Sequence, residues 1–474
     1  MRYFHPITKA LILLVFMACM AISPRALTQP EPGLSSDVRA RIDELARQTL
    51  VKTGVPSASI SVVKDGRLAY VQAYGNARVD PPVAATPAMR YSIGSISKQF
   101  TAAAVLMLAE EGRLSLDDPV SKFVPGLTRG NEVTVRQVLS HTSGYQDYWP
   151  HDYVPPFMLK ETTAAGILDR WARIPLDFEP GTQWQYSNTN YVIAGLIVEK
   201  ASGTPLLQFL AQRIFTPLGM KSVADIDRKK LPEADAAGYF RYALGPPRRA
   251  PKEAPGWLFA AAELAMTAED LQKWNIALMR HDLLKPASYQ ALETEIRLKN
   301  GAGTGYALGV SVGSFNGHRA VRHGGEVSGF TSSNVVLPDD GLAVAVLTNQ
   351  DAADASGRIA QGILGLLLKN DSSAIAPIDP LVRKALEGFA RGEIDRSLFT
   401  ENANAYFSAQ ALKDYSNSLA PLGAMASVAQ INAGNRGGMI LRGYTAKFAN
   451  RTLSISIFQM PDGKIEQFLI RPQD

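Results

Sequence analysis

Strand-like segments lie at both ends of one long region of this 474-residue sequence and enclose a helical middle. The early segment, SASISVVKDGRLAYVQAYG, alternates apolar and polar residues around Asp65-Gly66, a strong signal for a β-hairpin. Strand-like segments return from about residue 303, with turns at Asn316-Gly317 and at residues 339–341. We therefore expect an α/β (α+β) fold, in which one antiparallel sheet is assembled from both ends and a helical region is inserted.

Helical patterns fill the space between these strands. Residues 36–54 carry apolar positions at helical spacing and end on a glycine, as helices commonly do. Further helices are expected at residues 95–111, 134–140, 162–173 and 189–214. The later strands are expected in TGYALGVSVGSF, HRAVRHGGEVSGFTSSNVVLP and LAVAVLTNQ, followed by a helix in SGRIAQGILGLLL.

The length exceeds the usual size of a single core, so a large domain and a smaller one are expected. The polar, proline-bearing stretch KNDSSAIAPIDP is typical of a linker. We place the large domain at residues 34–370, the linker at 371–380 and a small α+β module at 381–474. Two helices and three strands are expected in the module.

The first 26 residues are typical of an export signal. Arg2 and Lys9 precede the apolar run ALILLVFMACMAI, which is too short to span a bilayer comfortably. We expect cleavage after Ala26, a periplasmic or secreted protein, and no integral membrane span once the signal is removed. Lipid attachment at Cys19 is the alternative, since a small residue precedes this cysteine.

Charge and cysteine content exclude several classes of protein. The formal charge falls from +5 to +2 after cleavage, because three cationic residues, Arg2, Lys9 and Arg25, precede the cut. No basic stripe interleaved with aromatics is present, so no nucleic-acid partner is expected. Cys19 is the only cysteine, which excludes a disulfide or thiolate metal site in the mature chain. The six histidines lack ligand spacing, and we expect neither a metal nor another cofactor.

The largely apolar segment YSIGSISKQFTAAAVLMLAEEG contains a serine and a lysine at a spacing that matters. Ser95 and Lys98 are three residues apart, which puts both on one helical face. An amine held in apolar surroundings tends to lose its proton, so Lys98 could deprotonate Ser95 without a histidine. Ser-x-x-Lys also occurs at Ser61 and Lys64, but in a strand residues three apart face opposite sides of the sheet.

Three segments carry a resemblance to a known family. They are YSIGSISKQFTAAAVLMLAEEGRLSLDDPVSKFVP, VTVRQVLSHTSGY and FEPGTQWQYSNTNYVIAGLIVEKASGTPLLQFLAQRIFTPLGM. In this order they resemble the serine β-lactamase and penicillin-binding protein superfamily, in particular the branch of class C β-lactamases, D-Ala-D-Ala carboxypeptidases and esterases. The resemblance covers about Leu34 to Leu367.

That family is defined by Ser-x-x-Lys, Tyr-x-Asn and a strand similar to Lys-Thr-Gly. The resemblance implies that Ser95 is the acylated nucleophile, with Lys98 as its partner and Tyr186 sharing the proton transfer. Whether Lys98 or Tyr186 is the base stays open. Asn188 would hydrogen-bond the substrate or hold Lys98, or else cap the following helix. Tyr-x-Asn recurs at 74–76 and 415–417, but only the copy at Tyr186 opens a helix.

The third element reads His323-Gly324-Gly325 in place of Lys-Thr-Gly. By resemblance these residues contact the substrate, and the N–H groups of Ser95 and Glu326 form the oxyanion hole. Histidine is mostly neutral at pH 7, so it clamps a carboxylate less well than lysine. An esterase or D-amino-acid peptidase activity is therefore favoured over an efficient β-lactamase.

A histidine, an aromatic segment and the C-terminal module remain to be interpreted. His141 is expected to be structural, because the resemblance places it in a turn behind the site. The aromatic segment YQDYWPHDY, residues 145–153, either lines the cleft or packs as a surface loop. The C-terminal module resembles a small NTF2-like accessory domain and carries no catalytic set.

The sequence thus predicts an exported serine hydrolase that cleaves an ester or amide in a small-molecule or peptide substrate through an acyl-enzyme. Two alternatives use the same residues: a penicillin-recognising sensor with little turnover, and an acyltransferase in which another acceptor replaces water. The identity of the substrate stays open. The sequence carries no signal of oligomeric state.

Overall fold

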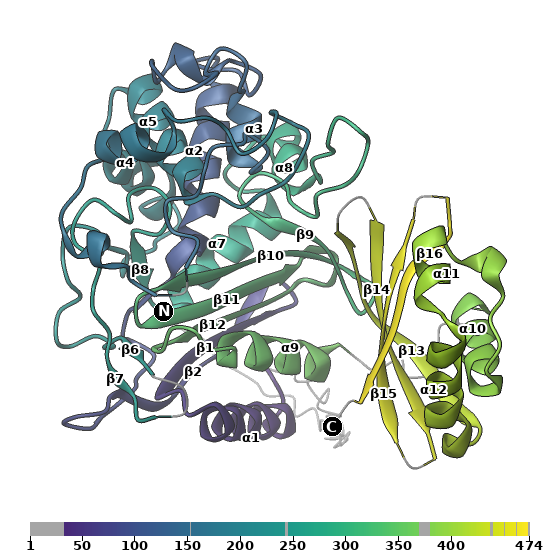
Figure 1. Ribbon diagram of the computed structural model, residues 1–474. Coiled ribbons are helices and arrows are strands. Elements are labelled where there is room, and N and C mark those ends of the chain that lie inside the picture. Colours follow the sequence, from purple (N-terminus) through teal and green to yellow (C-terminus); the bar gives the residue numbers. More distant parts are fainter. Residues whose placement is uncertain are drawn as a thin grey trace, which may run out of the picture. The chain divides into compact units, whose positions relative to one another are not determined.

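The computed structural model describes residues 33–151, 153–241, 245–368, 380–436, 439–449, 451–460 and 462–472. Seven strands form one antiparallel sheet in the order β3-β2-β1-β12-β11-β10-β9 (Figure 1). β1 pairs with β12, which confirms the prediction of a sheet assembled from both ends of the region. These strands are β1 (Ser57–Lys64), β2 (Arg67–Arg78), β3 (Val83–Ala84), β9 (Ser311–Phe315), β10 (His318–Val327), β11 (Phe330–Leu337) and β12 (Leu342–Thr348).

Tight turns set the register of the sheet. The β1–β2 hairpin turns at Asp65 and Gly66, as predicted, and both residues have positive φ angles, 53° and 67°. Such a turn has the twist that its flanking strands require. The predicted turn between β9 and β10 has the same character, with φ angles of 49° at Asn316 and 86° at Gly317.

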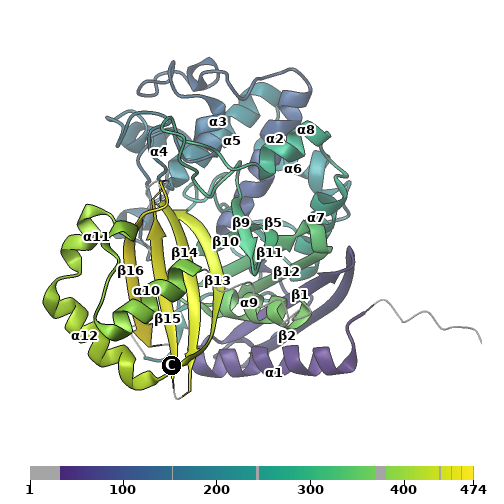
Figure 2. The same ribbon diagram turned by 90° about the vertical axis from the view of Figure 1, so that its right-hand side faces the viewer.

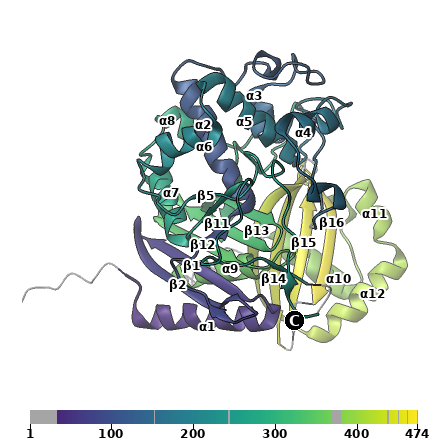
Figure 3. The same ribbon diagram turned by 90° about the vertical axis from the view of Figure 1, so that its left-hand side faces the viewer.

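Helices cover both faces of the sheet, and β12 shows how its side chains divide between them. Val344 and Val346 share a core with α1 (Ser36–Thr53) and α9 (Ala355–Leu367) on one face (Figure 3). Ala345 and Leu347, which point the other way, belong to the core of the helical region. A strand covered on both faces reads as a continuous apolar run, as LAVAVL does.

The helical region is built around α2 (Ser97–Glu110), which is buried along residues 97–108. The prediction of one continuous helix at 189–214 is wrong, because the chain forms two successive helices there. α5 ends before Gly203, whose φ is 72°, and a new helix begins after Pro205. The other helices here are α3 (Val135–Leu139), α4 (Ala164–Trp171), α5 (Asn188–Ser202), α6 (Leu206–Leu210), α7 (Ala268–Arg280) and α8 (Pro286–Glu293).

The strand expected from residue 304 begins only at Ser311. Gly305 and Gly309 adopt positive φ angles of 67° and 82°, which a strand does not accommodate. Short strands that the sequence did not indicate complete the region: β4 (Tyr91–Ser92), β5 (Ala224–Asp225) and β8 (Leu264–Met266) in one sheet, and β6 (Tyr239–Phe240) with β7 (Arg248–Arg249) in another.

The C-terminal module has helices against one face of a four-stranded antiparallel sheet, β13-β14-β15-β16 (Figure 2). Its own core includes Phe389, Phe407 and Phe468. Three strands were expected and four are present, because the polar stretch at 425–436 forms a strand without a clear apolar alternation. The elements are α10 (Pro380–Arg391), α11 (Glu401–Tyr406), α12 (Ala409–Leu419), β13 (Met425–Arg436), β14 (Met439–Phe448), β15 (Thr452–Gln459) and β16 (Ile465–Pro472).

Two predicted segments lie outside the described residues. They are the export signal at 1–26 and the linker at 371–380, of which only Pro380 is described, as the first residue of α10. Among the helices that the structure describes, none combines the length and apolar character needed to cross a membrane.

Candidate active site

Ser95 lies at the entrance to α2, in a short 3-10 turn (Gly94–Ile96) that leads directly into the helix. Lys98 follows in the first turn of α2, and its Nζ lies 2.9 Å from Ser95 Oγ. α2 is rich in Ala, Val and Leu on all sides, so it runs through the core as a buried helix. The helix thereby holds a lysine out of contact with water, next to a serine at the surface of a cleft.

The amine of Lys98 is fully buried and has three hydrogen-bond partners. It donates to Ser95 Oγ at 2.9 Å, to Asn188 Oδ1 at 2.8 Å and to the Ala261 carbonyl oxygen at 3.0 Å. Three acceptors match the three N–H groups of an ammonium. Nζ also lies 4.9 Å from the ring centre of Tyr186.

Burial lowers the pKa of Lys98 to about 7, and the Asp147 carboxylate opposes this shift by favouring the charged form. Lys98 is therefore neutral in a large share of molecules near pH 7. The neutral amine keeps two N–H donors and gains a lone pair, which can accept the hydroxyl proton of Ser95. The geometry thus provides a nucleophile and a base in contact.

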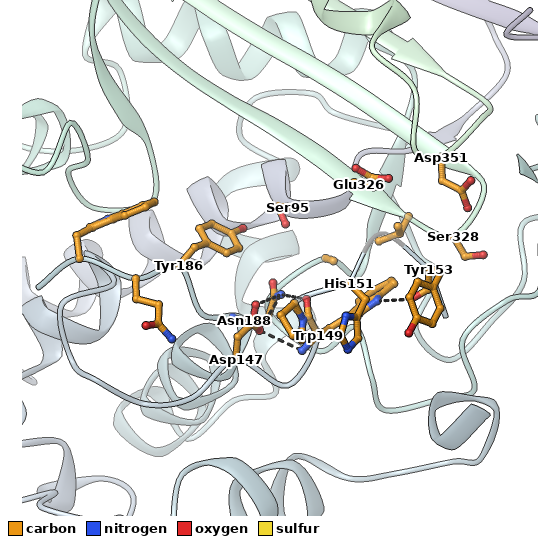
Figure 4. Close-up of a pocket in the computed structure, with 15 residues that line it drawn as sticks. Ser95, Asp147, Trp149, His151, Tyr153, Tyr186, Asn188, Glu326, Ser328 and Asp351 are labelled. Carbon is orange, nitrogen blue, oxygen red and sulfur yellow. Dashed lines mark hydrogen bonds between the residues drawn. The ribbon is translucent and has the colours of Figure 1, made fainter. Parts of the chain in front are cut away.

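Tyr186 stands beside the nucleophile, and its hydroxyl points toward Ser95 (Figure 4). The phenol oxygen is buried and has no hydrogen-bond partner among the described residues. Burial raises the pKa of Tyr186 above its usual value, and the nearby Ser95 hydroxyl offsets only part of this shift. Tyr186 is accordingly a protonated phenol at neutral pH, able to pass a proton on.

Asn188 links Lys98 to a carboxylate that the sequence analysis did not single out. Its side-chain oxygen accepts from Lys98, while its Nδ2 donates to Asp147 Oδ1 at 3.1 Å. The backbone N–H of Asn188 also donates to Asp147 Oδ1, at 2.9 Å. The alternative of a helix-capping asparagine does not hold, because the N-cap of α5 is Ser187 and the side-chain oxygen of Asn188 accepts from Lys98 instead.

Asp147 is therefore the residue that fixes the start of α5 and the orientation of the Asn188 amide. Burial raises its pKa, and hydrogen bonds from the backbone N–H groups of Asn188 and Trp149 offset part of that rise. The only signal in the sequence was a carboxylate within an aromatic segment, which is too common to indicate a role.

Strand β10 approaches the nucleophile closely because two glycines face each other. A Cβ atom on Gly325 would lie 1.9 Å from the Ile93 carbonyl oxygen, and one on Gly94 would lie 2.6 Å from the backbone nitrogen of Glu326. Ser332 Oγ also donates to the Ile93 carbonyl, at 2.9 Å. The turn that carries Ser95 is thus fastened to the strand.

The pairing of β10 with β11 sets the direction of the Glu326 N–H group. Val327 and Phe330 flank the two-residue turn of this hairpin, so they form a hydrogen-bonded pair. Pairs alternate along the ladder, and Glu326 with Thr331 is of the other kind. The Glu326 N–H is consequently directed away from β11 and toward the edge where Gly94 and Ser95 lie. This is the position expected for one donor of an oxyanion hole.

His323 is placed differently from the expectation that it contacts the substrate. Its ring is buried, with Nε2 2.9 Å from the Tyr306 hydroxyl and Nδ1 2.5 Å from the Gly324 carbonyl oxygen. Since a carbonyl only accepts, Nδ1 carries the proton and Nε2 accepts from Tyr306. Burial and the charge of Lys98 lower the pKa of His323 to about 4, so it is neutral, as predicted. It stands behind Tyr186 and is not part of the cleft lining.

His141 occupies the turn after α3, in agreement with its structural role. It adopts a positive φ of 60° and is fully buried. Its Nδ1 accepts from the Ser187 backbone N–H at 3.2 Å, and its ring lies 4.3 Å from that of Tyr186. Burial and the Lys98 charge hold its pKa well below the usual value. The histidine supports the Tyr186 ring from behind.

A cleft of about 540 Å³ opens over Ser95 (Figure 4). The segment 145–153 contributes to its lining, although Tyr145 and Tyr148 are buried in the core. No group of three metal-binding side chains occurs in the described part of the chain. The lining residues are Ser95, Asp147, Trp149, Pro150, His151, Tyr153, Trp184, Gln185, Tyr186, Asn188, Ala262, Glu326, Val327, Ser328 and Asp351.

Comparison with known proteins places this arrangement in a family. Residues 42–366, which include the sheet, α2, Tyr186 and β10, match the family described as Beta-lactamase. The chain belongs to the β-lactamase family. It is a family of serine hydrolases, and the matched residues include Ser95, Lys98 and strand β10.

The chain is similar to several known proteins, by sequence or by fold. Protein flp of Staphylococcus aureus strain MW2 is 31% identical over 67% of this chain, which spans only 64% of that relative's length. The D-stereospecific amidohydrolase of Streptomyces sp. is 30% identical, with a TM-score of 0.59 over 67% of this chain and 96% of its own. The octameric penicillin-binding protein homologue of Pyrococcus abyssi has a TM-score of 0.61 at 24% identity, over 92% and 96% of the two chains.

The position of the second Ser-x-x-Lys in this fold shows that its serine and lysine do not form a site. Ser61 lies on β1, is buried, and donates from its hydroxyl to the Ala268 carbonyl oxygen at 2.7 Å. Lys64 lies at the end of that strand, next to the hairpin turn. No shared site is formed, as the strand geometry predicted.

Proposed function

We propose that this member of the β-lactamase family is an exported hydrolase that cleaves an ester or amide through an acyl-enzyme on Ser95. One observation carries the proposal: the amine of Lys98 is fully buried and lies 2.9 Å from Ser95 Oγ. This burial lowers the pKa of Lys98 to about 7. A lysine in this state serves as a base at neutral pH.

Acylation begins when neutral Lys98 accepts the proton of the Ser95 hydroxyl. Ser95 Oγ then forms a bond to the carbonyl carbon, and the electron pair of the C=O bond moves onto oxygen. The backbone N–H groups of Ser95 and Glu326 stabilise this oxyanion, and each such donor contributes about 3 kcal/mol to lowering a barrier. Breaking the bond to the leaving amine or alcohol restores the carbonyl and leaves an ester on Ser95.

Proton delivery to the leaving group falls to Tyr186. Its phenol is protonated and directed toward Ser95, so it donates to the departing nitrogen or oxygen and recovers a proton from Lys98. In deacylation, neutral Lys98 takes a proton from water as the water oxygen bonds to the ester carbon. The bond from that carbon to Ser95 Oγ then breaks, Lys98 returns the proton to Oγ, and the acid product leaves. Lys98 is the base in this scheme, because the raised pKa of Tyr186 makes phenolate rare.

The substrate class proposed is an amide or ester of a D-amino-acid type, rather than a β-lactam. A structural relative at 30% identity is a D-stereospecific amidohydrolase. The described cleft lining also lacks the lysine or arginine that would hold a β-lactam carboxylate.

Labelling tests the nucleophile. A fluorophosphonate probe is expected to add its mass to a peptide containing Ser95, and Ser95→Ala to remove both labelling and turnover of a p-nitrophenyl ester. Ser61→Ala is the matched control, since it removes the other serine of the same motif and should leave labelling intact. An intact, folded protein that takes up no label would contradict the proposal.

Export is proposed from the N-terminal pattern alone. The mature protein recovered outside the cytoplasm is expected to begin at Leu27, as read by N-terminal sequencing. Cys19→Ser distinguishes the lipoprotein alternative, since it would release a lipid-anchored form from the membrane fraction and leave a secreted form unchanged.

A further inference from the structure

We propose that a second cavity, separate from the cleft over Ser95, binds a small organic carboxylate. Lys230, Arg249 and Lys252 contribute cationic groups to the lining of this cavity. The inference does not depend on the chemistry proposed for Ser95, because none of the residues that transfer protons there lines the second cavity. It gives the protein a further ligand, with a negative charge and a small apolar body.

The second cavity adjoins the cleft and has a volume of about 270 Å³. Val327 and Ser328, at the β10–β11 turn, are the only described residues that line both spaces. The rest of the lining comes from residues in or near β4, β5, β7 and β11, among them Ser92, Ile226 and Phe330. A space of this size suits a ligand of few atoms.

Two of the three cations have no acidic partner among the described residues. Lys230 and Arg249 are exposed, and the Arg249 guanidinium lies 5.5 Å from the ring centre of Tyr239. Lys252 is half-buried and donates to the Ile226 carbonyl oxygen. Burial lowers the pKa of Lys252, and the charge of Lys230 acts in the same direction. The cations therefore repel each other, and an anion between them would relieve this repulsion.

Glu253 is the one carboxylate among the described lining residues of the second cavity. Its Oε1 accepts from the Ser328 N–H at 2.8 Å. Burial raises the pKa of Glu253 to about 7, while that hydrogen bond and the charge of Lys252 oppose the rise and the charge of Asp351 adds to it. At about pH 6 Glu253 is therefore neutral in most molecules, and the cations dominate the lining.

Two other carboxylates of the same segments are held elsewhere. Asp227 accepts from the Leu258 N–H at 2.9 Å, and its charge acts on Lys252. Asp235 forms an ion pair with Arg90 at 2.6 Å. Neither of these carboxylates lines the second cavity, so the two exposed cations remain available to a ligand.

The buried part of the lining includes apolar surface and an unsatisfied hydroxyl. Val327 and Phe330 are 2% and 9% exposed and offer apolar contact. Ser92 is 1% exposed, and its Oγ has no hydrogen-bond partner among the described residues. Leaving a buried hydroxyl unpaired costs free energy, whereas an oxygen of the ligand would pair with it. The second cavity thus offers donors and apolar surface together.

Interactions between the walls hold the second cavity in shape. The Ser328 hydroxyl donates to the Pro251 carbonyl oxygen, which ties the segment of Lys252 to the β10–β11 turn. The Ala237 N–H donates to the Ala77 carbonyl oxygen at 3.0 Å, which ties another part of the lining to β2. The walls are therefore prearranged before a ligand binds.

These features favour an organic carboxylate over a phosphate. The planar fork of the Arg249 guanidinium matches the two oxygens of a carboxylate. A single negative charge also suits a lining that contains Glu253, since a dianion would meet more repulsion from it. The apolar surface at Val327 and Phe330 stabilises only a ligand with an apolar body.

Calorimetry with benzoate and benzamide tests the charge, because both have the same ring and only benzoate is an anion. With the intact chain at about pH 6, benzoate is expected to bind with a Kd below about 1 mM and benzamide about tenfold or more weakly. Inorganic phosphate tests the organic body and should also bind about tenfold or more weakly than benzoate. Benzoate that binds no more tightly than benzamide or phosphate would overturn the inference.

A double variant places the ligand. Lys230→Gln with Arg249→Gln should raise the Kd of benzoate by about tenfold or more and leave that of benzamide unchanged. Both side chains are exposed, so folding should persist, and thermal melting checks it. The matched control is Lys122→Gln with Arg358→Gln, which removes the same charge from side chains 51% and 63% exposed outside the cavity lining. The control should bind benzoate as the native protein does. Native affinity in the cavity variant would overturn the inference.

Labelling of Ser95 separates the two spaces. A small fluorophosphonate on Ser95 occupies the cleft and should leave the Kd of benzoate unchanged. Loss of benzoate binding on labelling would place the carboxylate in the cleft and overturn the second site. Failure of the proposed function would appear differently, as a native protein that takes up no label, and the comparison of the cavity variant with its control then still decides the inference.

Discussion

Single residues set the pH at which the site can work. Lys98 acts as a base only when it is neutral, and burial brings its pKa to about 7. Since the protonated form is inactive, kcat/KM for a non-ionising ester should rise with pH through about 7 and fall below it. A pH profile from about pH 4 to pH 9 checks this. An acid limb near pH 4 would instead point to His323, whose pKa is lowered to about 4.

Asp147 affects the pH of this acid limb through Asn188, which hydrogen-bonds both Asp147 and Lys98. Its charge favours the ammonium form of Lys98, so it raises the pKa of the base. Asp147→Asn keeps an oxygen for the Asn188 N–H and removes the charge, and the acid limb of kcat/KM should therefore move to lower pH. A purely structural role would lower activity at all pH values without moving the limb.

The control for this change is Asp117→Asn, which removes an exposed carboxylate paired with Arg136 outside the site. Its limb should coincide with that of the native enzyme. If the Asp147→Asn limb stayed in place too, the proposed effect of the Asp147 charge on the pKa of Lys98 would be wrong.

Sequence predicted some of these residues and missed others for a physical reason. Ser95 and Lys98 are three apart on one helix, so local geometry alone brings them together. Asp147 and Asp351 reach the cleft from loops distant in sequence, and no local pattern reports such an encounter. His323 lies in the expected strand, but only the structure shows that its Nε2 accepts a hydrogen bond from the Tyr306 hydroxyl.

At the scale of elements, the contact between β10 and the turn before α2 is the most demanding in the site. A methyl group on Gly325 would meet the Ile93 carbonyl oxygen at 1.9 Å, so Gly325→Ala must push the strand away from Ser95. Displacing the Glu326 N–H should lower kcat by about 100-fold or more. Turnover of a p-nitrophenyl ester measures the loss.

Gly313→Ala on the neighbouring strand β9 is the matched control, because nothing lies within 4 Å of its added methyl group. It should retain activity. Full activity in Gly325→Ala would show that the strand can shift without cost, which would contradict the proposed oxyanion hole.

The sheet was the most predictable element, and the reason is its pattern of side chains. Alternation around Asp65-Gly66 and the apolar run of β12 are read directly from sequence. The pairing of β1 with β12 followed from strands standing at both ends of the region. The helix and strand boundaries near Gly203 and Gly309 depend on positive φ angles. A glycine permits such an angle, but its presence in the sequence does not show that the angle occurs. The start of β9 and the end of α5 were therefore misplaced.

At the scale of the whole molecule, the described chain contains separate hydrophobic cores. The apolar residues of the C-terminal module, among them Phe389, Phe407 and Ile455, form one core of their own. The cores on the two faces of the large sheet contain none of them. Because cooperative unfolding follows shared cores, we expect the module and the β-lactamase region to unfold in distinct transitions.

Two core substitutions in the full chain separate these transitions. Phe389→Ala removes a fully buried ring from the module and should cost about 3–5 kcal/mol there. For a module of roughly 90 residues this lowers its Tm by about 10 °C or more, as calorimetry would record. Leu347→Ala, in the core beside the site, should lower the Tm of the other transition instead.

The midpoint of thermal inactivation should fall in Leu347→Ala and stay unchanged in Phe389→Ala. If both substitutions moved a single transition and the inactivation midpoint together, the two cores would be energetically one, and the module would contribute directly to the stability of the active site.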